Sequence, residues 1–496
     1  MAEIKKLTEE YVDYLRDESR STGFADGICF AACEEDIIDV LKKCYSDKTP
    51  VTIQGGRTGV AAGAVPYGGF VLNLSKMKRI LAERRDGEHF FITVEPGILL
   101  SELRNEIAAK YPDYFFAPDP TETSASLGGM VACNASGACS FMYGSTRDHV
   151  SGLKMILMDG RSLTIKRGEY FANGYDAKYV LDDGSVINAT VPHYEMPKTK
   201  KHVAGFYAKK DMDLMDLLIG CDGTLGVISE IEIELQKKPP FINSLLLFFD
   251  KQQESLEFVD DFRNKVPFLA AVEYFNHDSL DLITDRHFEN FIQVPEGVTT
   301  AIYTEIQAPS EEEGFESLGQ IDEFFTKHGG REENIIVASA PADIAKIKEF
   351  RHAAPESSNM QVDIYRRTYP ELTKMGGDMS VPDSRMFEAM KMFEDTIAEG
   401  GFKSAIWAHI GNSHIHANII SRNSEEYKRA HELFKVWAAN IVRMGGSVSA
   451  EHGVGKMKVD YVEIMFSEKD IDEMRAVKLA FDPEYLLSAG NVFRRK

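Results

Sequence analysis

The segment that most constrains this sequence is the glycine-rich stretch at residues 52–63, which reads Thr-Ile-Gln-Gly-Gly-Arg-Thr-Gly-Val-Ala-Ala-Gly. Glycine accepts positive φ angles and lets the backbone approach a ligand closely. Successive N–H groups in such a turn can hold an anion such as a pyrophosphate. The stretch joins an apolar strand ending at Ile53 to another at residues 70–74, without GxGxxG spacing or a following helix. It therefore predicts a phosphate-binding loop that is not a Rossmann fingerprint, although most glycine loops are simple turns.

A second segment rich in small residues occupies positions 117–137, and Tyr143 and Gly144 follow shortly after it. Small side chains allow the backbone to lie flat against a bulky planar ligand. The alternative is a tight contact between a helix and a sheet. A third glycine-punctuated segment, residues 217–228, leads into a strand at residues 231–235. The second segment strengthens the interpretation of the first as part of a ligand site.

The charge balance narrows the classes of partner. The chain has 56 basic and 78 acidic side chains, a formal net charge of −22. This balance argues against nucleic acid or an anionic membrane as the main partner. A small anionic substrate stays compatible, because it needs only local positive charge. At 496 residues, the chain is expected to form two or three domains.

The N-terminus and the cysteines indicate the compartment. The first residues are charged and lack the apolar core of a signal peptide, and the sequence has no apolar run of the roughly 18 residues that a membrane span requires. The six cysteines form no CxxC pair, so reduced thiols are expected rather than disulfides or an iron–sulfur segment. We expect a cytoplasmic protein without a membrane span.

The domain pattern changes after Pro239 and Pro240. Expected strands and helices then alternate, which predicts an α+β domain around an antiparallel sheet. The expected domains are a ligand-binding domain at residues 1–240, a second domain at 241–444, and a segment at 445–496 that returns to the first domain. Residues 166–215 are polar and are interpreted as an irregular excursion without recognisable chemistry.

Histidines concentrate in the second half of the chain. His414 and His416 share one face of an expected strand, because side chains repeat every two residues in a strand, and His409 can join them if residues 411–413 make a turn. Glu451 and His452 form a second cluster. A carboxylate with two imidazoles is a common ligand set for a divalent transition metal. The alternative is that these histidines bond backbone carbonyls at a domain interface.

Several cations could bind an anionic substrate. Arg351 lies on an expected helix, and a guanidinium can hold a carboxylate through two parallel hydrogen bonds. Arg366, Arg367 and Lys374 add positive charge nearby. An ordinary surface arginine and a solvated basic face are the alternatives.

Taken together, these segments resemble the flavoenzymes of the vanillyl-alcohol-oxidase type, and within them the D-2-hydroxyacid dehydrogenases that act on D-lactate, glycolate or D-2-hydroxyglutarate. The likeness covers nearly the whole chain except residues 166–215. Each matching motif is weak alone, but their order and spacing are specific. The matching motifs are Gly55-Gly56-Arg57-Thr58-Gly59, Asp119-Pro120, Gly128-Gly129, Asn134-Ala135, Tyr143-Gly144, Gly223-Thr224-Leu225-Gly226, His409 to His416, and Glu451-His452-Gly453.

The resemblance implies that residues 1–240 are a FAD-binding domain with FAD held between two α/β subdomains, and that residues 241–444 are a substrate or cap domain that covers the flavin. It also assigns roles to particular residues. The implied metal ligands are His409, His416 and Glu451, the implied base is His452, and the implied substrate-binding cations are Arg351 and Lys374. The implied FAD-contacting residues are Gly55, Gly56, Arg57, Thr58, Gly59, Val60, Pro118, Asp119, Leu127, Gly128, Gly129, Asn134, Ala135, Ser136, Gly137, Gly226, Val227, Ile228 and Glu451.

The sequence departs from the family pattern at several positions. Arg57 stands where the family usually has glycine, which would strain the backbone or add a phosphate contact. Asp222 replaces a glutamate, and residues 488–490 replace Asn-Pro-Gly, which affects one FAD contact. His414 replaces the asparagine of Asp-Gly-Asn, a change that bears on metal choice or affinity. No histidine or cysteine occupies the position used for covalent flavin attachment, so non-covalent FAD is expected.

The expected reaction is oxidation of a 2-hydroxy acid to the 2-oxo acid, with hydride transfer to FAD and assistance from a divalent metal, either Zn, Mn or Fe. Three alternatives stay open: an oxygen-using FAD oxidase of another alcohol, a transferase like the alkylglycerone-phosphate synthases, and a flavoprotein subunit that mainly transfers electrons. An electron-transfer flavoprotein or iron–sulfur partner would be a separate chain. The sequence leaves the oligomeric state open, with a homodimer as one option.

Overall fold

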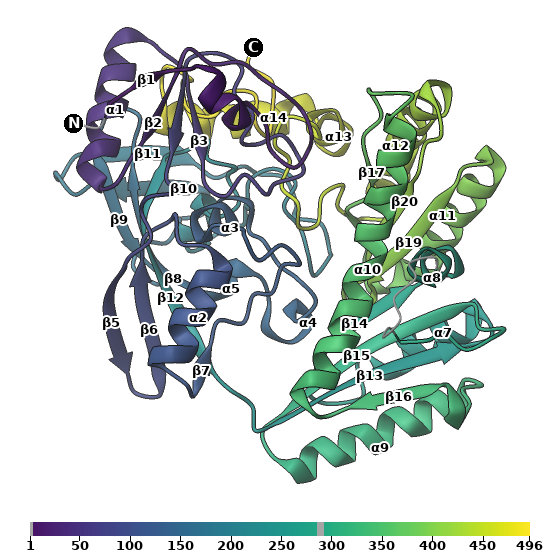
Figure 1. The fold of residues 1–496 in the computed structure, drawn as a ribbon. Coiled ribbons are helices and arrows are strands. Elements are labelled where there is room, and N and C mark those ends of the chain that lie inside the picture. The colour runs from purple at the N-terminus through teal and green to yellow at the C-terminus, as the bar shows by residue number, and fades with distance from the viewer. Residues whose placement is uncertain (1–2, 285–291) are drawn as a thin grey trace.

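The computed structural model describes residues 3–284 and 292–496. The chain forms two lobes, one built from the N-terminal half and one from residues after β12 (Figure 1). The chain passes from the first lobe to the second between β12 (Val227–Lys237) and β13 (Phe241–Phe249). The last segment, coloured yellow, crosses back and packs on the first lobe.

The first lobe begins with a small sheet in the order β1-β2-β4-β3, in which β2 and β3 run parallel to β4. Helix α1 (Glu34–Asp47) is amphipathic, and its buried face packs on Cys29 and Leu72 of this sheet. The glycine-rich loop connects the two strands β3 and β4, as the sequence predicts. The strands are β1 (Lys5–Lys6), β2 (Gly27–Phe30), β3 (Val51–Gln54) and β4 (Phe70–Asn73).

The second sheet of this lobe is antiparallel and has the order β5-β6-β12-β8-β9, with β7 paired to the far end of β12. Short helices lie between its strands and the first sheet. The strands are β5 (Ile80–Asp86), β6 (His89–Val94), β7 (Tyr114–Phe115), β8 (Val150–Ile156) and β9 (Ser162–Lys166). The helices are α2 (Leu100–Lys110), α3 (Leu127–Cys133), α4 (Ser140–Tyr143), α5 (Thr146–His149) and α6 (Met215–Leu218).

The second lobe is built around an eight-stranded sheet in the order β16-β13-β15-β14-β19-β20-β17, with β18 also paired to β20. Alternate residues of β13 face opposite helices: Leu246 and Phe248 pack with α10 (Pro341–Arg366), whereas Leu247 and Phe249 pack with α7 (Gln252–Phe262) and α9 (Glu311–Lys327). Helices on both faces explain why residues 245–249 of this strand are continuously apolar. Its other strands are β14 (Leu269–Phe275), β15 (Thr300–Ala308), β16 (Ile335–Ala338), β17 (Met375–Gly376), β18 (Met379–Ser380), β19 (Ser404–His409) and β20 (His414–Ile419).

The remaining helices belong to the second lobe and the C-terminal segment, except for one 3₁₀ turn near the N-terminus. They are α8 (His277–Thr284), α11 (Met386–Gly400), α12 (Ser424–Arg443), α13 (Val459–Met465) and α14 (Glu468–Phe481), together with the 3₁₀ turns η1 (Glu9–Leu15), η2 (Glu332–Asn334), η3 (Asp383–Arg385) and η4 (Ile410–Asn412). The α+β class and the antiparallel cap sheet predicted from the sequence are confirmed.

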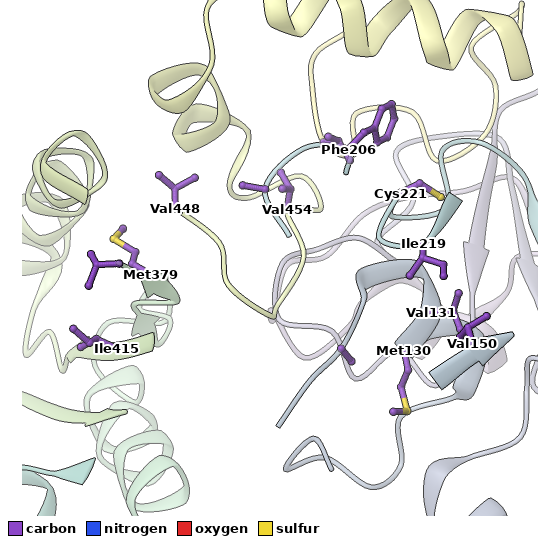
Figure 2. Packing of buried hydrophobic residues seen from close by; sticks show 14 of the residues in the cluster. Met130, Val131, Val150, Phe206, Ile219, Cys221, Met379, Ile415, Val448 and Val454 are labelled. Atoms are coloured by element: carbon purple, nitrogen blue, oxygen red, sulfur yellow. The ribbon is translucent and has the colours of Figure 1, made fainter. Parts of the chain in front are cut away.

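The C-terminal segment joins the two lobes through its side chains and its backbone. Figure 2 shows Val448 near Met379 and Ile415 of the second lobe, and Val454 on the side of Phe206 and Cys221 of the first. Its backbone also extends the first sheet, because Leu487 bridges Val51 in a parallel sense.

The interpretation of residues 166–215 as irregular is wrong in part. This segment contains an antiparallel hairpin, β10 (Asp176–Val180) and β11 (Val186–Thr190). The hairpin buries Ala177, Tyr179 and Ile187 against the rest of the lobe. Polar residues on its outer face alternate with these buried ones, which is the two-residue pattern of a strand. The pattern is easily overlooked in the sequence because each strand has only five residues.

Among the described residues, no helix combines the length and the apolar composition that crossing a membrane requires.

Candidate active site

A cavity of ≈ 540 Å³ is lined by residues of both lobes. The glycine loop, the small-residue segment and α3 contribute from the first lobe. Helix α10 and strands β14, β19 and β20 contribute from the second, and the segment after Glu451 contributes from the C-terminal part. The glycine-rich stretches and the histidine cluster, which are far apart in the sequence, therefore face one cavity.

The glycine loop offers backbone donors to this cavity. In the described part of the chain, the N–H groups of residues 57–60 donate to no protein atom, whereas the N–H of Gly56 is held by Ser126 Oγ at 3.1 Å. A Cβ atom added to Gly59 would meet nothing within 4 Å. Free N–H groups next to open space suit a pyrophosphate, so the residues present fit the phosphate part of FAD.

Most of the implied FAD-contacting residues line the cavity, but five do not. The lining ones are Gly55, Gly56, Arg57, Thr58, Gly59, Val60, Gly128, Gly129, Ala135, Ser136, Gly137, Gly226, Ile228 and Glu451. The side chains of Leu127 and Val227 are buried in the core. The Asp119 carboxylate accepts from Cys139 N, Asn134 Oδ1 accepts from Arg147 N, and the Pro118 carbonyl accepts from Arg104. These five lie behind the wall of the cavity and support it.

Arg57 occupies the left-handed region, with φ = 60°. Its guanidinium stacks over the Tyr14 ring, 4.2 Å from the centroid, and donates to the Asp13 carbonyl. The side chain therefore ties the loop to the N-terminal segment instead of pointing at a phosphate. The backbone strain expected from replacing glycine is present, and the stacking contact offsets part of it.

The three neighbouring histidines come together through a tight hairpin. Strands β19 and β20 pair antiparallel, and η4 makes the turn between them with Ser413 at φ = 49°. The turn places His409 opposite His414 in the register. Glu451 approaches from the C-terminal segment, so that His409, His414, His416 and Glu451 offer ligand atoms that all lie within 4.8 Å of one another.

One oxygen of Glu451 faces two imidazoles. Its Oε1 lies 3.1 Å from His409 Nε2 and 3.3 Å from His416 Nε2. The opposite ring nitrogens are held by other groups: His409 Nδ1 by Glu273 Oε1 at 2.8 Å, and His416 Nδ1 by the Gly377 carbonyl at 2.9 Å. Outer partners of this kind orient metal-binding imidazoles. The two Nε2 atoms and Oε1 therefore form a set that fits a divalent transition metal.

The other oxygen of Glu451 reveals a residue that the sequence analysis missed. Lys201 Nζ and Ser136 Oγ each lie 2.8 Å from Glu451 Oε2. Lys201 is buried, with 4% of its surface exposed, and belongs to the segment that was interpreted as carrying no chemistry. That interpretation is wrong for this residue. The polar sequence around Lys201 does not predict that this lysine is buried, because its burial depends on a contact with a residue 250 positions away in the chain.

Asp378 organises the segment that carries Glu451 and His452. Its fully buried carboxylate accepts from the N–H groups of both residues at 3.1 Å and from His414 Nε2 at 2.9 Å. The Nδ1 atom of His452 lies 3.7 Å from Asp378 Oδ2, and its Nε2 lies 3.8 Å from Glu451 Oε1. His452 thus has a carboxylate behind it and the imidazole cluster in front of it.

Two of the predicted substrate-binding cations line the cavity. Arg351, on α10, lies 4.0 Å from Glu273, and its Nε is buried without a hydrogen-bond partner in the described structure. Lys374 lies over the Trp407 ring, 5.0 Å from its centroid. The Nη2 atom of Arg351 lies 2.8 Å from His352 Nε2. A guanidinium that lines a cavity suits a carboxylate ligand. Arg366 and Arg367 do not line the cavity, and Arg366 pairs with Asp363.

Burial and charge shift several pKa values in this site. Burial lowers the pKa of His409, but attraction to Glu273 outweighs this effect and raises it to about 9. Burial lowers the pKa of His452 to about 4 and that of Lys374 to about 8. Burial would raise the pKa of Glu451, but Lys201 and His409 hold it well below its usual range. The site therefore combines an ionised Glu451 with a neutral His452 at neutral pH.

Comparison with known proteins defines the class. Residues 238–492 match the C-terminal domain of FAD linked oxidases, and residues 25–166 match a FAD binding domain. The chain belongs to the family of FAD linked oxidases, and the family resemblance seen in the sequence is confirmed. It is a FAD-binding oxidoreductase with the vanillyl-alcohol-oxidase type of fold.

Individual proteins of known function are also similar to this chain. The chain is 26% identical over 467 residues to glycolate oxidase subunit GlcD of Bacillus subtilis, covering 93% of this chain and 87% of the relative. It is 27% identical over 494 residues to a D-lactate dehydrogenase of Anaerostipes hadrus, covering 97% and 92%. Its fold is similar to that of p-cresol methylhydroxylase, with a TM-score of 0.68 at 15% identity over 99% of this chain and 93% of that one.

Proposed function

We propose that this protein oxidises a D-2-hydroxy acid to the corresponding 2-oxo acid. The observation that carries the proposal is the shared cavity. A loop with free N–H groups, the guanidinium of Arg351, and a His452 flanked by two carboxylates all line it. The relatives named above, a glycolate oxidase subunit and a D-lactate dehydrogenase, support a small hydroxy acid as the substrate.

Arg351 would bind the substrate carboxylate through its guanidinium, and Lys374, from the same lobe, would add a second positive charge at the cavity. A bidentate guanidinium fixes the orientation as well as the position of a carboxylate. Holding the carboxylate in one orientation also fixes C2 and its hydroxyl relative to the rest of the cavity.

His452 would take the proton of the substrate hydroxyl at Nε2, the ring atom that faces the cluster. The pKa of His452, lowered to about 4 by burial, keeps the imidazole neutral and its lone pair available at neutral pH. The Asp378 carboxylate near Nδ1 would stabilise the imidazolium after proton transfer. This arrangement supports His452 as the general base and Asp378 as a positioning residue.

Two groups absent from the structure would complete the site. FAD held by the glycine loop and the small-residue segment supplies a hydride acceptor. A divalent ion at His409, His416 and Glu451 supplies positive charge beside the substrate hydroxyl. Reoxidation of the flavin requires an electron acceptor, which would be a separate electron-transfer flavoprotein, an iron–sulfur subunit or, in the alternative function, oxygen.

The decisive experiment is anaerobic reduction of the purified flavoprotein by a panel of D- and L-2-hydroxy acids, followed by flavin absorbance, before and after chelation and metal add-back. Bleaching by one D-acid that chelation abolishes would support the reaction, its stereochemistry and the metal together. A flavin that no hydroxy acid reduces would contradict the proposal. Rapid reoxidation in air would favour the oxygen-using alternative for the second half-reaction.

A variant tests the base separately. We expect His452→Ala to retain FAD and to lose about 10²- to 10⁴-fold in turnover, the usual contribution of a positioned base. The measurement is steady-state kcat together with the flavin content of the purified protein. Full activity with a normal flavin spectrum would remove His452 from this role.

A further inference from the structure

His414 is the third imidazole of the cluster and is fully buried. Its ring centroid lies 4.3 Å from that of His416 and 5.2 Å from that of His409. It replaces an asparagine of the family pattern, so the two-histidine ligand set implied by the family does not account for it. The structure places it between two carboxylates, Asp378 on one side and Glu451 on the other.

The hydrogen bond to Asp378 determines which nitrogen of His414 carries its proton. His414 Nε2 lies 2.9 Å from Asp378 Oδ1, and an ionised carboxylate can only accept. The proton of a neutral ring is therefore on Nε2, and the lone pair is on Nδ1. Nδ1 is buried and has no hydrogen-bond partner in the described structure, and it lies 3.9 Å from Glu451 Oε2. A buried acceptor aimed into a cluster of metal-ligating groups calls for a partner.

His149 shows that a buried Nδ1 without a hydrogen-bond partner does not by itself indicate a metal ligand. It is also buried, its Nε2 is held by the Tyr143 carbonyl at 2.9 Å, and its Nδ1 has no partner. Among the described residues, however, no group of potential metal ligands includes His149. The difference between the two histidines lies in what surrounds the free nitrogen, which makes His149 a matched control.

We propose that His414 Nδ1 is a fourth protein ligand, so that the metal centre of this chain is formed by three histidines and one glutamate. The inference rests on the proposed function, because it adds a ligand to the metal proposed at His409, His416 and Glu451. The four residues offer ligand atoms within 4.8 Å of one another. Ser136 and Lys201 hold Glu451 Oε2, which leaves Oε1 for the metal.

The additional imidazole changes the metal that the site selects. Imidazole nitrogen favours Zn²⁺, Fe²⁺, Co²⁺ and Ni²⁺, whereas oxygen-rich sets favour Mg²⁺ and Mn²⁺. A site with three imidazoles and one carboxylate therefore binds Zn²⁺ or Fe²⁺ more tightly than a site with two imidazoles. A metal ion with a coordination number above four would still have positions for substrate oxygens.

The test uses the FAD-loaded protein after chelation. Zn²⁺ is titrated against a chromophoric competitor in the wild type, His414→Gln and His149→Gln, and zinc X-ray absorption counts the imidazoles. Glutamine retains an amide donor for Asp378 and removes the ring nitrogen. We expect X-ray absorption to count three imidazoles in the wild type. We expect the Zn²⁺ affinity of His414→Gln to be lower by about 100-fold or more, because a direct ligand should contribute at least as much as the residues that only orient ligands, which contribute up to about 100-fold. The Zn²⁺ affinity of His149→Gln should equal that of the wild type.

The outcomes separate this inference from the proposed function. Two imidazoles in the wild type, or an unchanged affinity in His414→Gln while His416→Gln loses binding, would overturn the fourth ligand and leave the proposed metal intact. Absence of Zn²⁺ and Fe²⁺ binding by the wild type would overturn both. If His414→Gln fails to fold, as judged by flavin absorbance and thermal melting, the imidazole count of the wild type alone decides the question.

Discussion

The glycine loop at residues 55–60 and the cluster around Glu451 line the same cavity, but they are assembled differently. The loop uses backbone atoms of one continuous stretch between two strands. The cluster uses side chains from β19, β20 and the C-terminal segment, with Lys201 and Glu273 added from two further segments. A backbone site tolerates many side chains, whereas a side-chain site depends on each member. The two regions should therefore respond in opposite ways to substitution.

The largest effect is expected at Glu451, which contacts two imidazoles, Lys201 and Ser136. Glu451→Gln retains the shape and removes the charge, so we expect kcat to fall by about 10³-fold, the scale of losing one electrostatic catalytic group. Glu451 is also an implied FAD contact, but the loop that offers N–H groups to the pyrophosphate is untouched, so we expect the flavin to stay bound. Steady-state kinetics and flavin absorbance measure the two properties, and loss of FAD would show that the regions are not independent.

Lys201 tests whether the cluster is held by charge. Removing one member of a buried ion pair costs about 3–5 kcal/mol, so Lys201→Met should destabilise the metal-free protein by about that amount. A bound divalent ion would compensate the charge of Glu451, and the loss should then be smaller. The measurement is the free energy of unfolding with and without Zn²⁺. Equal losses in the two states would argue against a metal beside Glu451.

Two neighbouring glycines test the loop. A Cβ at Gly56 would lie 2.6 Å from the Ser124 carbonyl, so Gly56→Ala should destabilise the protein by about 1–3 kcal/mol through overpacking. A Cβ at Gly59 would meet only open space. Gly59→Ala should therefore leave the flavin-free protein unchanged and weaken FAD binding. Thermal melting of the flavin-free protein and a FAD titration distinguish the two effects, and unchanged FAD affinity in Gly59→Ala would place the pyrophosphate elsewhere.

The smallest effect concerns Lys374, whose pKa is lowered by burial to about 8. Below this pH the lysine is charged and binds a carboxylate, so KM should rise by up to about 10-fold as pH increases from 7 to 9. The same shift makes the unfolded chain bind more protons between pH 8 and 10.5, so this group's unfavourable contribution to stability decreases over that window. Lys374→Arg should abolish the KM dependence, and a persistent dependence would assign it to another group.

The sequence predicted the loop well because the relevant information is local. Glycine spacing, flanking apolar strands and small residues act within a few positions of one another, and the structure confirms a loop between β3 and β4. The alternating pattern of the second lobe likewise predicted an antiparallel sheet, which the structure confirms. The hairpin at β10 and β11 was missed because its alternating pattern extends over only five residues in each strand.

The cluster could be predicted only in part. His409, His416 and Glu451 stand in recognisable motifs, so the sequence indicated them as metal ligands, an assignment that stays a prediction. It did not indicate Lys201, because a polar excursion offers no reason to expect a buried cation. Nor did it indicate the role of Asp378, which holds His414 and the backbone at Glu451 and His452. These residues acquire their roles through contacts between distant segments.

By itself, the sequence determined the class of protein: a FAD linked oxidase in which glycine-rich segments and a histidine–glutamate pair lie in a defined order. Only the tertiary structure decided how the site is charged and oriented. It assigned one Glu451 oxygen to Lys201 and Ser136 and the other to His409 and His416, and it left His414 Nδ1 unpaired. The physical reason is that backbone conformation follows local sequence, whereas burial and electrostatic pairing depend on which distant segments meet.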